Sequence, residues 1–164
     1  MTDQAVKSAP ASRPKVTPLN RPKILSHGTL ECRDLAASRR FYEEFLGLTV
    51  VRHSQNSMKF RLGEYFCVVC LQRDDRVRPT AVGNHWGVDM ASKEDVVRAH
   101  QLAHDMKDVY GIDKITKLID NETYGFYFSD LDGNWWEMQY AGEGQGEGKG
   151  RNDEHFENGD VVPM

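Results

Sequence analysis

The stretch ILSHGTLECRDLAASRRFYEEFLGL, residues 24–48, contains two kinds of periodicity in succession. Apolar and polar residues alternate through residues 24–32, as they do in a half-buried β-strand. From Asp34 onward the apolar side chains recur at helical spacing; Asp34 can cap the helix and Gly47 can end it. The stretch therefore predicts a strand followed by a helix.

Three strand-like segments follow this unit in the first half of the chain. They are rich in β-branched and other apolar residues, and polar or Gly-containing turns separate them. The segments are LTVVRHS (48–54), SMKFRLG (57–63) and YFCVVCLQ (65–72). The first half therefore has the order strand, helix and three strands.

The second half of the chain repeats this order. NHWGVDM (84–90) is a strand candidate, and Ser92 with Asp95 resembles a capping box that opens a helix reaching Gly111. Three more strand candidates follow, ITKLID (115–120), YGFYFSD (124–130) and NWWEMQY (134–140). The chain thus contains an internal duplication.

Two histidines mark equivalent places in the two repeats. His27 precedes the predicted cap Asp34 by seven residues, and His85 precedes the predicted cap Ser92 by seven residues. Two curled sheets, each with a helix on its back, can bury their apolar faces and leave a cleft between them. We therefore predict an α+β fold of paired βαβββ modules with a curled-sheet cleft.

The duplication also predicts the domain boundaries. Residues 22–140 are expected to form one domain, composed of modules at residues 22–72 and 82–140. Residues 1–21 mix Ser, Pro, Lys and Gln, and residues 141–164 are Gly-rich and then acidic. Both ends are therefore expected to be flexible and to lie outside the core.

The composition excludes several classes of partner. The net charge is -4 and the Lys and Arg residues are scattered, which argues against nucleic-acid binding. The sequence contains neither a secretion signal nor a run of about 20 apolar residues that could cross a membrane. Its three cysteines are odd in number and lie in strand-like runs, so disulfides are not expected. We expect a soluble, cytoplasmic protein.

Strand parity predicts which side chains face the cleft. Because side chains alternate across a strand, Thr29 shares a face with His27, and Trp135 shares a face with Glu137. By the repeat, Cys70 near the end of the first module is the expected counterpart of Glu137. The expected lining is His27, His85, Glu137, Tyr127 and Cys70, with Thr29 and Trp135 as further substrate contacts.

Three of these side chains suit a metal site. Two neutral imidazoles and a carboxylate can hold a divalent transition metal and leave other positions open to water or substrate. An unpaired buried Glu137 would be unfavourable, and a metal supplies the missing counter-charge. The alternatives are that His27 and His85 are hydrogen-bonded core residues and that Cys70 is a small buried apolar residue or a soft fourth ligand that favours zinc.

The segments that carry these residues resemble the vicinal oxygen chelate superfamily. That superfamily includes glyoxalase I, fosfomycin-resistance transferases, methylmalonyl-CoA epimerases and extradiol ring-cleaving dioxygenases. The matching stretches are residues 24–48, NHWGVDM at 84–90 and GFYFSDLDGNWWEMQ at 125–139. The resemblance implies paired strand-helix-three-strand modules and a divalent metal bound by His27, His85 and Glu137.

The resemblance also separates groups within the superfamily. Glyoxalase-like and epimerase-like members carry a carboxylate ligand where this chain has Cys70. Two His and one Glu are more similar to the extradiol enzymes, which use Fe(II), and to the fosfomycin transferases, which use Mn(II). Tyr127 lies ten residues before Glu137 and fits both groups, where such a tyrosine lies beside bound substrate. Fe(II) is therefore the favoured metal, with Mn, Zn and Ni as alternatives.

The favoured function is an extradiol-type ring-cleaving dioxygenase acting on a catechol-like aromatic substrate. Tyr127 would hydrogen-bond the oxyanion that develops, and Trp135 would favour a planar substrate. The alternatives are a glyoxalase-like isomerase or lyase, a fosfomycin-type transferase, and a metal-free drug-binding protein like the bleomycin-resistance members. We expect a homodimer, whose modules pair within one chain or exchange between chains.

Overall fold

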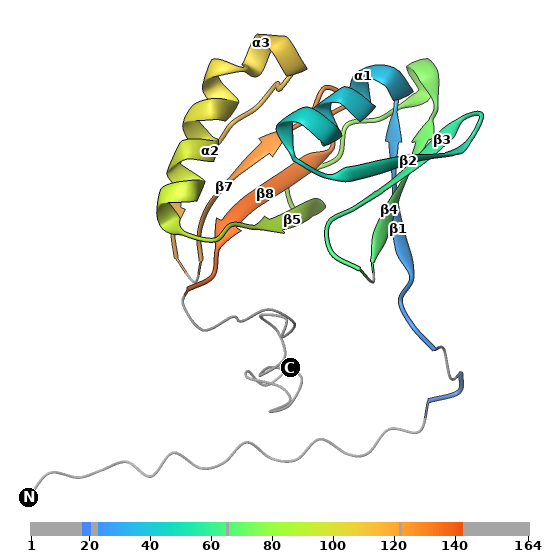
Figure 1. Cartoon of the computed structure of the whole chain (residues 1–164), viewed down its shortest axis with the longest axis horizontal. Coiled ribbons are helices and arrows are strands. Elements are labelled where there is room, and N and C mark those ends of the chain that lie inside the picture. Colours follow the sequence, from blue (N-terminus) through green and yellow to red (C-terminus); the bar gives the residue numbers. More distant parts are fainter. Residues whose placement is uncertain (1–17, 21–22, 65, 122, 143–164) are drawn as a thin grey trace, which may run out of the picture. The chain divides into compact units, whose positions relative to one another are not determined.

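The computed structural model describes residues 18–20, 23–64, 66–121 and 123–142 (Figure 1). Most of the two predicted flexible ends lies outside the described residues. Lys23–Gly142 forms one compact unit, and its strands make two four-stranded sheets. Each sheet belongs to one of the two predicted modules, which confirms the α+β architecture of paired modules.

The first module has the predicted order of strand, helix and three strands. Its sheet has the strand order β1-β4-β3-β2, with β1 parallel to β4 and the other neighbours antiparallel. The elements are β1 (His27–Cys32), α1 (Leu35–Arg40), a π-helical turn η1 (Phe41–Phe45), β2 (Thr49–Ser54), β3 (Ser57–Arg61) and β4 (Cys67–Gln72).

The first helix begins and ends where the sequence predicts. The Asp34 carboxylate accepts a hydrogen bond from the Ala37 amide at 2.8 Å, and Gly47 follows the helix with a φ of 68°. The helix widens toward its end, where the Leu46 amide donates to the Phe41 carbonyl at 3.2 Å. This wider π-turn continues α1 without a break and was not predicted.

The second module repeats this topology. Its sheet has the strand order β5-β8-β7-β6, with β5 parallel to β8. After the short connecting turn η2 (Asp74–Arg76), the elements are β5 (His85–Asp89), α2 (Lys93–Asp105), α3 (Lys107–Tyr110), β6 (Ile119–Asp120), β7 (Tyr124–Ser129) and β8 (Trp135–Tyr140).

The second predicted helix begins at the expected cap but is divided in two. The Ser92 hydroxyl accepts a hydrogen bond from the Asp95 amide at 3.1 Å, as a capping residue does. Met106, whose φ is -103°, separates α2 from α3, and Gly111 ends α3 with a φ of 67°. In the described part of the chain no helix has both the length and the apolar character needed to cross a membrane.

One hydrophobic core joins the two modules. Aromatic residues of the first helix pack against aromatic residues of the second sheet. The ring centroids of Phe41 and Phe128 lie 6.4 Å apart, and those of Tyr42 and Trp136 lie 5.7 Å apart. Each sheet therefore turns one face toward the shared core and leaves its other face open.

A buried turn between β7 and β8 fixes one module against the other. The Asp132 carboxylate accepts hydrogen bonds from the Arg33 amide at 2.9 Å and from the Ser38 hydroxyl at 2.8 Å. The Asn134 side chain donates to the Glu31 carbonyl at 3.0 Å. The turn thereby satisfies polar groups at the junction between β1 and α1, which would otherwise be buried without partners.

The neighbouring Asp130 lies deeper in the same turn. Its carboxylate accepts hydrogen bonds from the Tyr42 hydroxyl at 3.2 Å, the Trp136 indole at 3.2 Å and the Asn134 amide at 2.9 Å. Only 1% of Asp130 is exposed, and this burial raises the pKa of its carboxyl. This carboxyl group is thus enclosed by hydrogen-bond donors from both modules.

Candidate metal-binding site

The open face of the second sheet carries the predicted site residues of that module. Trp136 and Met138 of β8 are buried in the core, so Glu137 between them projects from the opposite face. Strand β7 follows the same rule, because Phe126 and Phe128 are buried and flank Tyr127. The predicted parity of both strands is confirmed.

His85 and Glu137 lie side by side on this face. The Nε2 atom of His85 is 3.3 Å from Oε2 of Glu137. The Nδ1 atom of His85 is 2.8 Å from the Val82 carbonyl oxygen. Because a carbonyl only accepts hydrogen bonds, Nδ1 carries a proton, and this contact leaves Nε2 directed toward the carboxylate.

This geometry fits two adjacent ligands of one divalent metal ion. Two atoms that bind a metal at about 2.1 Å, with an angle of about 90° to 109° between the bonds, lie about 3.0 to 3.4 Å apart. The observed separation of 3.3 Å falls in that range. A hydrogen bond from the second ring nitrogen to a carbonyl is also the usual way in which a metal-binding histidine is oriented.

Tyr127 lies next to this pair. Its ring centroid is 5.0 Å from that of His85, with the rings nearly perpendicular, and Tyr127 is opposite Glu137 in the register of β7 and β8. The main-chain amide of Tyr127 donates to the Thr116 hydroxyl at 2.9 Å. Tyr127 is therefore held beside the His85 and Glu137 side chains, where a substrate bound to a metal could reach its hydroxyl.

Trp135 is on the same face, two residues before Glu137. Its indole nitrogen donates to the Thr80 carbonyl at 3.0 Å, which fixes the ring. The Lys114 ammonium lies 5.8 Å from the centroid of the ring and adds a positive charge near this face. Neither Thr80 nor Lys114 belongs to a recognisable motif, and sequence reasoning did not find them.

The structure does not bring His27 to His85 and Glu137 within one chain. His27 begins β1 in the other sheet, is exposed, and has its Nδ1 atom 2.9 Å from the Ser26 hydroxyl. Among the described residues, no three His, Cys, Asp or Glu side chains are grouped closely enough to hold a metal ion. The three predicted ligands are thus divided into a pair and a separate histidine.

Thr29 lies with His27 on the first module. It is exposed on β1 and lines a small hollow of about 220 Å³ together with Glu31, Arg78 and Trp86. The hollow does not include His85, Glu137 or Tyr127. A contact of Thr29 with a substrate at the His85 and Glu137 pair remains a prediction.

The predicted position of Cys70 in the cleft is wrong. Cys70 is fully buried in the core, and Cys32 lies beside it. Thr29 and Gly87 are equivalent, because each lies two residues after the histidine of its module. Thr29 pairs with Val69 and Gly87 pairs with Glu137, so Val69 is the structural counterpart of Glu137. A shift of one residue along a strand moves a side chain to the other face. The hydrogen bond with Cys32, together with burial, raises the pKa of the Cys70 thiol, which disfavours a thiolate ligand.

The other histidines of the folded unit are remote from the open face of the second sheet. His100 on α2 donates through Nε2 to the Thr116 carbonyl at 3.0 Å, and its ring centroid is 4.9 Å from that of Phe126, which faces the core. His104 packs against His100 with a centroid distance of 4.7 Å. His53 lies on β2 of the first sheet. His85 is the one histidine of the described second sheet.

Solved structures with this fold include proteins of several activities. The fosfomycin resistance protein FosX of Listeria monocytogenes, complexed with Mn(II) and sulfate, is 18% identical with a TM-score of 0.60, and the match covers 75% of this chain and 94% of FosX. FosX of Mesorhizobium loti is 22% identical with a TM-score of 0.57, covering 75% and 96% of the two chains. Lactoylglutathione lyase of Agrobacterium tumefaciens is 18% identical with a TM-score of 0.53, covering 74% and 96%.

These likenesses establish a shared fold at low sequence identity. No significant match was found among curated proteins. The family model of the Glyoxalase/Bleomycin resistance protein/Dioxygenase superfamily matches residues 24–138, which include all three predicted ligands and nearly all of both modules. The chain therefore belongs to the Glyoxalase/Bleomycin resistance protein/Dioxygenase superfamily.

Proposed function

We propose that this protein is a metal-dependent enzyme that acts on a small-molecule substrate with two neighbouring oxygen atoms. The observation that supports this proposal is the 3.3 Å approach of His85 Nε2 to Glu137 Oε2. Without a cation, or a proton on Nε2, the nitrogen lone pair and the carboxylate oxygen would repel each other. A divalent metal converts this repulsion into two bonds.

The third ligand in this proposal is His27 from a second copy of the chain. Within one chain the two sheets share a single hydrophobic core. His27 is exposed on β1 and does not form a group of three ligands with His85 and Glu137 among the described residues. In a dimer with twofold symmetry, His27 of the partner subunit can complete the pair on the first chain, and the reverse contact forms a second, equal site. The site is therefore incomplete without the partner copy.

Fe(II) is the favoured metal, with Mn, Zn and Ni as alternatives. Imidazole and carboxylate ligands suit iron and manganese as well as zinc, so this donor set does not select one metal by itself. The FosX structure from Listeria monocytogenes contains Mn(II), which makes manganese the first alternative.

The favoured reaction is extradiol-type cleavage of a catechol-like aromatic ring. The bound metal would supply Lewis-acid charge to the substrate oxygens and access to molecular oxygen. Tyr127 donates a hydrogen bond to the more negative substrate oxygen, and the Trp135 ring offers an aromatic wall on the same face. These two side chains favour a planar substrate.

The second candidate is a fosfomycin-type reaction. His85 is the one histidine of the described second sheet, so within that sheet Tyr127 is the group with a hydroxyl beside the pair, and no second imidazole is available as an acid or base. This arrangement favours chemistry that needs mainly a Lewis acid. Two of the similar structures are fosfomycin resistance proteins, which is consistent with this alternative.

The first experiment measures bound metal and then activity. The full chain is purified without added metal, analysed by mass spectrometry for transition metals, and reconstituted separately with Fe(II) and Mn(II). Oxygen uptake on addition of catechol supports ring cleavage, and loss of fosfomycin in the presence of Mn(II) supports the second candidate. A protein that takes up no metal under any of these conditions contradicts the proposal and indicates a metal-free binding protein.

The second experiment tests the shared site. His27→Ala and Glu137→Gln are each expected to weaken metal binding at least about tenfold when prepared alone. In a mixed dimer of the two variants, one site carries both substitutions and the other carries neither. Unfolding and refolding the variants together should therefore restore metal binding to a fraction of the sites. If the three ligands met within one chain, mixing would restore none.

A further inference from the structure

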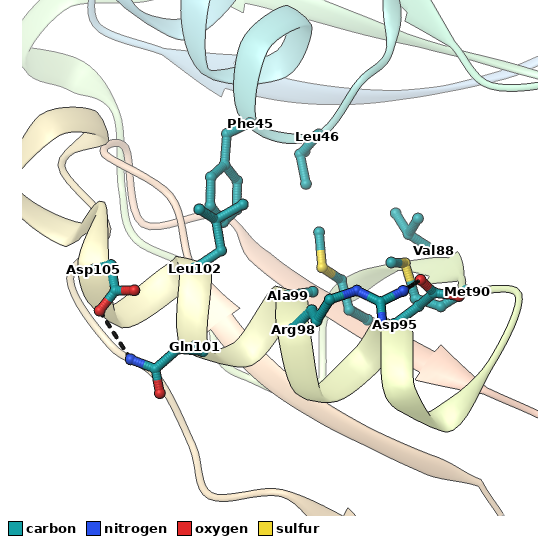
Figure 2. Close-up of a pocket in the computed structure, with 11 residues that line it drawn as sticks. Phe45, Leu46, Val88, Met90, Asp95, Arg98, Ala99, Gln101, Leu102 and Asp105 are labelled. Carbon is teal, nitrogen blue, oxygen red and sulfur yellow. Dashed lines mark hydrogen bonds and ion pairs between the residues drawn. The ribbon is translucent and has the colours of Figure 1, made fainter.

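A groove lies on the core side of the second sheet, away from the open face. It has a volume of about 600 Å³ and lies between helix α2 and the end of η1 (Figure 2). Phe45 and Leu46 of the first module form one wall, and Ala99 and Leu102 of α2 form the other. The groove is thus formed by both modules and is lined mainly by apolar side chains.

The floor of the groove separates it from the candidate metal site. Val88 of β5 and Met138 of β8 line the floor and are paired in the register of the two strands. Met138 directly follows Glu137 and projects from the opposite face of β8. A molecule in the groove would therefore lie across the sheet from the His85 and Glu137 pair.

Charged side chains of α2 surround the apolar part of the groove. Asp95 forms an ion pair with Arg98, so these two charges compensate each other. The Asp105 carboxylate accepts a hydrogen bond from the Gln101 amide at 2.8 Å, and no cation pairs with Asp105 in the described part of the chain. The groove therefore carries one uncompensated negative charge.

The dimensions of the groove favour a small molecule over a protein partner. Eleven residues line it. Its volume lies within the range of about 300 to 1,000 Å³ that is typical of ligand pockets. Two methionines, Met90 and Met138, are among the lining residues and can adapt to different apolar shapes.

We propose that this groove binds an apolar organic cation, a molecule with a hydrocarbon or aromatic body and one positive charge. The apolar body lies between the wall of Phe45 and Leu46 and the wall of Ala99 and Leu102. The positive charge lies toward Asp105, whose exposed carboxylate has the Gln101 amide but no cation as a partner within the described residues. This site is independent of the proposed metal-dependent activity.

The test compares two probes that have the same shape and opposite charge. Tetraphenylphosphonium is a cation and tetraphenylborate is an anion, and both carry four phenyl rings. Equilibrium dialysis against the full chain should show saturable binding of one phosphonium per chain. The borate should bind at least about tenfold more weakly, because attraction to the carboxylate becomes repulsion. Equal binding of the two ions contradicts the assigned charge.

Two pairs of variants locate the binding. Leu102 is 47% exposed, so Leu102→Lys and Leu102→Glu should both fold while they add opposite charges to the groove. The lysine variant should weaken phosphonium binding about threefold or more, and the glutamate variant should strengthen it. Asp105→Asn should also weaken binding, whereas Asp75→Asn, at an exposed position outside the groove, should leave it unchanged.

A last control separates the groove from the metal site. Glu137→Gln should leave phosphonium binding unchanged, because Glu137 projects from the other face of the sheet. Loss of binding in that variant would place the cation at the open face and overturn the proposal. Absence of saturable phosphonium binding, or equal affinity in the Leu102→Lys and Leu102→Glu variants, would overturn it as well.

Discussion

Trp86 of β5 packs directly on the main chain of Gly28 in β1. A Cβ atom added at Gly28 would lie 2.1 Å from Cη2 of the Trp86 indole. The ring of Phe66 is also close, with its centroid 6.3 Å from that of Trp86. The absence of a side chain at residue 28 thus allows the first strand of one module to approach the first strand of the other.

Gly28→Ala is expected to destabilise the protein, because the added methyl group must displace a large and partly buried ring. Overpacking of this kind typically costs about 1 to 3 kcal/mol. The free energy of unfolding, measured with urea, should fall by this amount. Gly83→Ala is the matched control, since nothing lies within 4 Å of a Cβ at that residue.

The same contact gives a double-mutant test. Trp86→Leu removes the part of the ring that the new methyl group would meet, so Gly28→Ala should be less damaging in that background. If the losses of stability in the double variant were additive, the methyl group at residue 28 would not be clashing with the Trp86 ring.

Glu137→Gln should weaken metal binding at least about tenfold, a loss that is typical even for changes of groups that only support a ligand. The amide keeps the size of the side chain but removes the charge beside His85. Competition with a chelator measures the affinity. Glu31→Gln is the control, because Glu31 pairs with Arg73 and lies on the first sheet. Unchanged affinity in Glu137→Gln would refute its role as a ligand.

The buried turn between β7 and β8 offers a test of the joint between modules. Asp132→Asn replaces one carboxylate oxygen with a donor that faces the Arg33 amide or the Ser38 hydroxyl. Leaving such a buried group unsatisfied costs about 1 to 3 kcal/mol. Urea unfolding should show this loss in a single transition. Asp113→Asn, at an exposed position, should change stability little.

Asp130 should make the stability depend on pH. Burial raises the pKa of its carboxyl in the folded protein above the value of about 3.9 in an unfolded chain. The folded state then holds the proton more tightly, so this contribution is fully present below the unfolded pKa and is lost as the pH rises through the folded pKa. Urea unfolding at several pH values should show this decline in the wild-type chain but not in Asp130→Asn. The opposite slope would contradict the assignment.

The three thiols should react at different rates. Cys67 is partly exposed, whereas Cys32 and Cys70 are buried. Hydrogen bonding to Cys32 and burial also raise the pKa of the Cys70 thiol, which lowers its thiolate content. A thiol reagent should label one cysteine per folded chain, and Cys67→Ser should abolish that labelling. Rapid reaction of Cys70 would place it outside the core.

The features of the fold that depend on local chemistry were predictable from sequence. The caps Asp34 and Ser92, and the alternation around Tyr127 and Glu137, are each set by residues within a few positions. The repeat predicts Cys70 as the counterpart of Glu137, but the true counterpart is Val69, one residue earlier on the strand. The pairing of Val69 with Thr29 is fixed by the neighbouring strand and has no signal in the spacing of the histidines.

The relation between the three ligands was less predictable. Equal spacing gives His27 and His85 the same place in their own modules, but the packing of Tyr42 against Trp136 decides how the modules meet. That packing is set by contacts between residues far apart in the sequence. The contact between Val82 and His85 also escaped prediction, because a main-chain carbonyl leaves no mark in the sequence.

The turn that carries Asp132 and Asn134 also constrains how the chain is made. Its partners Arg33 and Glu31 emerge from the ribosome about a hundred residues earlier, at separations of 99 and 103 positions. Until that turn is made, the Arg33 amide and the Glu31 carbonyl lack these two partners and must be satisfied by water. We therefore expect the turn between β7 and β8 to dock on the end of β1 late in the synthesis of the chain.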